Sequence, residues 1–202
     1  MTTRKILIPE IDGTPKQIWF ASASGNSITA ANDRRDPTSG NRTFCKITLA
    51  SLANSTSEST GARQSDKVDL GAVRAPMYRV TGVFEFAATP TAGNVVEAWW
   101  SDSQSSTPGN ANLGGASGVD GGYSGYSSNI TASLRQCQPI GEFVVTAQVT
   151  TTKQIRFIGV LVPFARYGSL ILWNKSGAAY HSSDVECHVV FDPFFPQGQA
   201  EV

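Results

Sequence analysis

The amino-acid sequence predicts an all-β protein: an antiparallel, jelly-roll-like sandwich with one short helix and one long loop rich in glycine and serine. Ser, Thr, Gly and Asn account for 68 of the 202 residues, and small polar residues of this kind suit turns. Val and Ile together number 27, against 11 for Leu and Met, and branched side chains favour the pleated surface of a strand. Apolar or alternating runs are short and are bounded by turn-forming residues, which is typical of a sandwich or barrel.

Ten such runs are predicted to be strands. Each is a short stretch of apolar or alternating residues between clusters of Gly, Pro, Asn and Ser, and helical periodicity is almost absent from them. The predicted strands are residues 4–8, 16–21, 43–49, 67–70, 78–86, 94–100, 142–150, 154–162, 169–174 and 185–192.

One segment, residues 129–138, predicts a short helix instead. Asn129 is a favourable N-cap residue, and Ile130, Leu134 and Cys137 recur at helical spacing.

The spacing between neighbouring runs predicts two hairpins. Pro90 and Gly93 suit a compact turn within residues 86–94, and the link 150–154 is short enough for antiparallel pairing of the strands on either side. The run 154–162 is nearly continuous in apolar residues. We therefore expect it to be a central strand, either buried on both faces or lying against a neighbouring subunit.

Residues 101–128 form the longest irregular stretch. These 28 residues contain seven glycines and no apolar periodicity, and compact domains seldom leave so long a loop without a role. Because strand patterns flank the stretch on both sides and no second core follows it, we expect an extended loop or arm on a single domain spanning residues 1–202.

The charge balance excludes several partners. Lys plus Arg and Asp plus Glu number 16 each, so the formal net charge is zero. No basic run is longer than Arg34-Arg35, so the sequence lacks the cationic patch that binding to nucleic acid or to an anionic membrane requires. The apolar stretch at residues 6–8 is far shorter than the core of a signal peptide. We expect no nucleic-acid or membrane partner, and synthesis in a cytoplasm.

The chemistry-bearing residues predict neither a metal site nor catalysis. Three widely spaced cysteines without a CxxC pair predict buried reduced thiols rather than zinc ligands or disulfides. A calcium loop is also unsupported, because Asp102 and Asp120 lack its regular alternation. The remaining enzyme hypothesis is a glycosidase in which Glu85 and Glu97, on the two arms of the predicted hairpin, flank a sugar. We expect these two carboxylates to be solvated instead, and we expect no cofactor.

Aromatic residues provide the candidate contact sites. Trp99 and Trp100 are adjacent in a predicted strand, so their side chains point to opposite faces and only one of them can fill the core. Aromatic anchors are enriched at interfaces. The candidate interface residues are Trp99, Trp100, Tyr123, Tyr126, Phe194 and Phe195.

Two stretches, residues 118–141 and 159–193, each contain a series of turn-forming motifs. These motifs are Gly118-Val119-Asp120-Gly121-Gly122-Tyr123, Ser127-Ser128-Asn129, Leu134, Ile140-Gly141, Arg166-Tyr167-Gly168-Ser169, Asn174-Lys175-Ser176-Gly177-Ala178-Ala179, His181-Ser182 and the closing run to Pro193. The later stretch resembles the C-terminal part of small structural proteins encoded in the virion gene clusters of tailed bacteriophages, and the earlier one is similar to the same group. The two stretches together make up 59 of the 202 residues, under a third of the chain. It implies a virion component with a jelly-roll-like fold and no active-site residues.

The resemblance and the neutral, lightly charged composition together predict a non-enzymatic virion protein. The expected role is head decoration, or cement, by a symmetric homo-oligomer, a trimer, that binds the assembled major capsid protein. A collar, neck or tail component is the first alternative. A lectin-like module that reads host-surface carbohydrate is the alternative of a different class.

Overall fold

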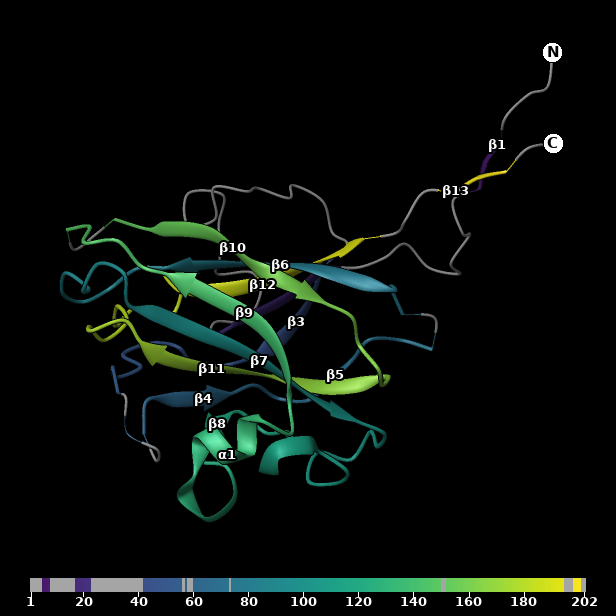
Figure 1. Ribbon diagram of the computed structural model, residues 1–202, viewed down its shortest axis with the longest axis horizontal. Coiled ribbons are helices and arrows are strands. Elements are labelled where there is room, and N and C mark those ends of the chain that lie inside the picture. The colour runs from purple at the N-terminus through teal and green to yellow at the C-terminus, as the bar shows by residue number, and fades with distance from the viewer. Residues whose placement is uncertain are drawn as a thin grey trace.

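A computed structural model of the chain describes residues 5–7, 17–22, 42–55, 57, 60–72, 74–149, 152–194 and 198–200. One large sheet dominates it and curls into a half-barrel (Figure 1). The strands are β1 (Lys5–Leu7), β2 (Gln17–Ala21), β3 (Arg42–Lys46), β4 (Ala62–Gln64), β5 (Val68–Asp69), β6 (Met77–Phe84), β7 (Val95–Ser103), β8 (Gly121–Gly122), β9 (Gln138–Val144), β10 (Gln154–Leu161), β11 (Tyr167–Lys175), β12 (His188–Phe194) and β13 (Gly198–Ala200). The helices are the 3-10 turns η1 (Leu113–Gly115) and η2 (Tyr126–Ser128) and the short α1 (Ile130–Leu134).

The strand order in the sheet is β3-β2-β12-β6-β10-β9-β7-β11-β4-β8, with β5 paired to β11. Every pairing is antiparallel except that of β2 with β3, and β1 pairs with β13 as a separate two-stranded ribbon. The all-β, jelly-roll-like prediction is confirmed. Each of the ten predicted runs contains or overlaps a strand, whereas the short strands β4, β8 and β13 were not predicted.

The two halves of the curled sheet meet through aromatic side chains. Trp100 on β7 lies 6.4 Å from Phe20 on β2 and 5.6 Å from Phe191 on β12, measured between ring centroids. All three are completely buried. Gly168 on the adjacent strand β11 leaves room for the indole, because a Cβ there would overlap it. The core therefore lies inside the curl, between sheet halves that are far apart in strand order.

The curl depends on a close approach of β9 and β10. These strands pair at a single position, Gly141 opposite Gly159. A Cβ at Gly159 would overlap the carbonyl oxygen of Ile140, and a Cβ at Gly141 would overlap that of Ile158. Two facing glycines thus let the backbones cross at a distance that no other residue permits.

The predicted hairpin at residues 86–94 is wrong. β6 pairs with β10 and β12, and β7 pairs with β9 and β11, so the two strands that this turn joins belong to different parts of the sheet. The antiparallel pairing predicted across residues 150–154 is confirmed, since β9 and β10 are antiparallel neighbours.

A second layer covers the outer surface of β7, β11 and β4. Helix α1 buries Ile130 and Leu134 against Ile171 and Trp173 of β11. The predicted N-cap is confirmed, because the Asn129 side chain accepts a 2.9 Å hydrogen bond from the Ala132 amide. The excursion 101–128 lies beside this helix as the predicted loop (Figure 1), and it contains the end of β7 together with η1, β8 and η2.

Strand β10 is central in the strand order, as predicted, but it is buried on one face only. Ile158 and Leu161 point into the core, whereas Phe157 and Val160 are 58% and 44% exposed. Of the two alternatives for this strand, burial on both faces within the domain is therefore wrong. Contact with a neighbouring subunit stays a prediction.

We predict that Gly159→Ala lowers the free energy of unfolding by about 3 kcal/mol, because its Cβ can be placed only by separating β9 from β10. Urea denaturation measures the change. Gly122→Ala on β8 is the matched control: it has an ordinary φ and no atom within 4 Å of the added Cβ. Equal stability losses in the two variants would contradict the role assigned to the crossing.

Candidate interaction surface

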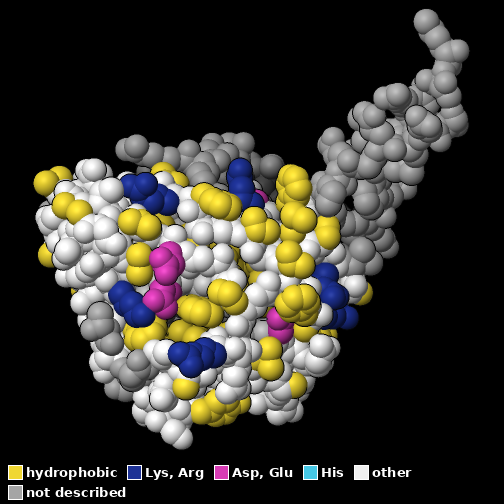
Figure 2. All heavy atoms as spheres, viewed as in Figure 1, with side chains coloured by type: hydrophobic (Ala, Val, Ile, Leu, Met, Phe, Trp, Pro, Cys, Tyr) yellow, Lys and Arg dark blue, Asp and Glu magenta, His cyan; other side chains and the backbone are white. Residues whose placement is uncertain are grey.

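The outer surface of β10, β6 and β12 carries exposed apolar side chains. The strand register places Phe157 beside Thr81, Val160 beside Arg79, and Phe194 beside Met77. Figure 2 shows hydrophobic side chains gathered over β10 and the adjoining end of β6. We name this surface the outer apolar face. It is defined by four side chains that are between 42% and 58% exposed, Phe157, Val160, Val162 and Phe194. The half-buried Met77 lies between them.

A β-bulge directs Phe157 outward. The register between β10 and β6 shifts between Phe157 and Gly159, so one extra residue is accommodated there and the alternation of side chains is reset. As a result Ile158 fills the core while Phe157 and Val160 both face out.

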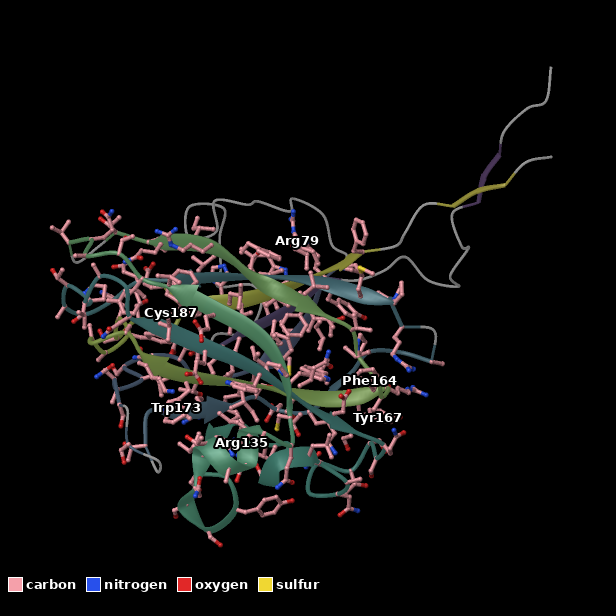
Figure 3. The ribbon with its side chains drawn as sticks, viewed as in Figure 1. Arg79, Arg135, Phe164, Tyr167, Trp173 and Cys187 are labelled. Carbon is pink, nitrogen blue, oxygen red and sulfur yellow. The ribbon has the colours of Figure 1, made fainter. Side chains whose placement is uncertain are left out.

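An ion pair on this face is formed within the chain. Arg79 lies 3.3 Å from Asp192 across β6 and β12, and the Gln17 side chain donates a 2.6 Å hydrogen bond to the same carboxylate. In Figure 3, Arg79 extends from the outer side of the sheet. The surface therefore presents apolar groups around a neutral pair.

The six candidate interface residues differ in how far they are buried. Trp100 is completely buried and Tyr123 is 2% exposed, so neither presents a side chain to a partner in this fold. Trp99 is half-buried against the cluster under α1, as expected for the tryptophan that points away from the core. Tyr126 and Phe194 are 53% and 54% exposed. Phe195 lies outside the described residues.

The exposed residues of β10 were not among those candidates, although the nearly continuous apolar run 154–162 was the signal that could have identified them. Lys67 was also missed. Its ammonium group donates hydrogen bonds of 2.7 to 3.0 Å to the Ser103 hydroxyl and to the carbonyls of Ser105, Thr107 and Asn110. Burial lowers the pKa of Lys67 below its ordinary value. One cation therefore organises the first part of the excursion.

Asp120 anchors the later part of the excursion. Its carboxylate accepts hydrogen bonds from the Thr48 amide at 2.9 Å and the Thr48 hydroxyl at 2.5 Å, and it lies 2.7 Å from the Arg63 guanidinium. Burial alone would raise the pKa of Asp120, but the bonds from Thr48 and Arg63 outweigh it and hold the pKa below its ordinary value. The excursion is thus fixed to the body at both ends.

The two carboxylates of the glycosidase hypothesis have separate partners. Glu85 is buried, 3.6 Å from Lys153 and 3.8 Å from the His181 imidazole. Glu97 pairs with Lys175 at 2.5 Å and accepts a hydrogen bond from the Trp99 indole. Since β6 and β7 are not paired, the hairpin on which this hypothesis depended is absent. The expectation that both carboxylates are solvated is wrong for Glu85, which is 5% exposed.

The three cysteines are free thiols, all buried: Cys45, Cys137 and Cys187. Burial is the main cause that raises the pKa of each to about 12. Thiols in this state are weak nucleophiles at neutral pH.

Within the described ranges, no three His, Cys, Asp or Glu side chains are grouped closely enough to hold a metal ion. The described residues also include no helix that is long and apolar enough to span a membrane. Comparisons with models of protein families, with curated proteins and with solved structures gave no match to this chain.

We predict that Asp120→Asn lowers the free energy of unfolding at pH 7 by about 2 kcal/mol, because it removes charge-assisted hydrogen bonds to Thr48 and Arg63. The pKa of Asp120 is lowered on folding, so its contribution is complete above its ordinary value of 3.8 and is lost as the pH falls through the folded value. Urea denaturation should show the difference from the wild type shrinking in acid. The exposed Asp184→Asn is the control, and a pH-independent deficit would contradict the carboxylate's role.

We also predict that none of the three cysteines reacts with Ellman's reagent in the native protein near pH 8, because each thiol is buried and its pKa stands near 12. After unfolding in guanidinium, all three should react. Rapid reaction of any thiol before unfolding would contradict this arrangement.

Proposed function

We propose that the protein is a non-enzymatic structural component of a tailed-bacteriophage virion, a decoration or cement protein that binds the assembled head shell as a homo-oligomer. The outer apolar face is the observation that carries the proposal. Two phenylalanines and two valines of one sheet face stand partly in solvent around a neutral ion pair, and grouped exposed apolar side chains are typical of protein interaction surfaces.

The resemblance of residues 118–141 and 159–193 to small virion structural proteins supports the location. The balanced charge of the whole chain is in keeping with it, since near-neutral surfaces associate readily.

The excursion supplies a second surface, which we assign to the shell. Leu113, Val119 and Tyr126 are 43%, 52% and 53% exposed there. The anchors at Lys67 and Asp120 hold the excursion in one arrangement before it meets a partner. Such preorganisation strengthens binding, because less conformational entropy is lost on association.

The mechanism is mass action. A protein that binds the expanded, assembled shell but not its free subunits stabilises the assembled state by a free energy set by affinity and concentration. Many copies on one particle add their contributions. No chemical step is needed.

We predict that the protein copurifies with virions, and that particles stripped of it lose resistance to heat or osmotic shock but still adsorb to host cells. Re-addition of the purified protein should restore resistance. Tyr126→Ala should weaken binding to stripped particles by roughly tenfold, because an aromatic anchor is removed. Val149→Ala, at an exposed position outside the excursion, is the control.

Two outcomes would support other functions. Labelled antibody bound at the neck or tail, with head stability unchanged, would favour a collar, neck or tail component. Loss of adsorption with intact heads would favour a carbohydrate-binding module, for which the exposed Tyr126 ring is the candidate stacking surface.

A further inference from the structure

We infer that the outer apolar face is the contact between two copies of this chain, related by a twofold axis. The inference rests on the proposed function, since it names the partner of the same face, and it separates that face from the shell-binding excursion. The sequence favoured a trimer. A self-complementary face instead favours pairs of subunits.

The area of the face suits a dimer. A stable interface buries roughly 800 Å² per partner, somewhat more than half of it apolar. The four exposed side chains together with Met77 offer on the order of 400 Å² of apolar surface, since a whole aromatic side chain accounts for about 200 Å². Polar rim residues on the neighbouring strands can provide the remainder.

The charges also favour a second copy over other partners. Among the described residues, the face carries the ion pair of Arg79 and Asp192 on adjacent strands. A twofold rotation about an axis between β6 and β12 would bring the Arg79 of one copy toward the Asp192 of the other, so that opposite charges alternate around the axis. An acidic partner or a nucleic acid would require unpaired cations on this face, whereas Arg79 is already neutralised.

The position of the face is compatible with simultaneous shell binding. The outer apolar face lies on β10, β6 and β12, in the middle of the strand order, and the excursion packs beside α1 at one end of that order, next to β4 and β8 (Figure 1). One surface can therefore join copies while the other meets the shell.

Analytical ultracentrifugation of the full chain tests the inference. The wild type is expected to sediment as a dimer at micromolar concentration, and Val160→Lys should weaken the dimer by roughly tenfold or more, because it buries like charges across the axis. Val119→Lys is the matched control: it alters an exposed valine of the excursion and should leave the dimer intact while weakening shell binding. A monomeric wild type, or equal dimerisation of the two variants, would overturn the inference.

Crosslinking gives a second readout that does not depend on disruption. Val160→Cys should form a disulfide-linked dimer on mild oxidation, because the three native thiols are buried and the new one lies near the axis. Val119→Cys should not form it. Crosslinking of Val119→Cys in preference to Val160→Cys would overturn the inference. Dimers that fail to bind virions would instead refute the proposed function alone.

Discussion

The close crossing of β9 and β10 is the constraint on which the sheet's shape depends. Gly141 and Gly159 face each other, and a Cβ atom on either one would overlap a backbone carbonyl oxygen of the opposite strand. Because the strands meet at this one position, β9 can turn toward β7 while β10 remains paired with β6. The sheet therefore bends there. Its two halves come to face each other, and Trp100 reaches Phe20 and Phe191 across the interior.

The same crossing explains why an apolar surface is left outside. The bulge that accommodates Gly159 resets the alternation of β10, so that Phe157 joins Val160 on the outer side. In a regular β10, Phe157 and Val160 would point to opposite faces, because three positions separate them. The bulge thus accounts for the exposure of these two side chains on the same face. Association through this face would remove apolar surface from water that a single copy leaves exposed.

Features fixed by neighbouring residues could be predicted from the sequence, and features fixed by distant ones could not. Period-two alternation placed Trp99 and Trp100 on opposite faces, and the Asn129 cap acts over three residues. The 86–94 hairpin was wrong because β6 pairs with β10 and β12, strands much later in the chain, and the local sequence does not reveal such distant pairing. Lys67 was missed because the oxygens it binds lie 36 to 43 residues away. Trp100 and Tyr123 resembled interface anchors only because a sequence does not reveal burial.

Two charged side chains, Lys67 and Asp120, hold the excursion in place. With few ionic groups on its surface, the protein can place individual charges where each has several partners: Lys67 binds four oxygens of residues 103–110, and Asp120 binds Thr48 and Arg63. A glycine-rich loop has high conformational entropy when free. Two multiply bonded charges help to offset that entropy, together with the burial of Tyr123 in the cluster under α1. The loop can then expose Leu113, Val119 and Tyr126 in fixed positions, which a flexible arm of the same composition could not do.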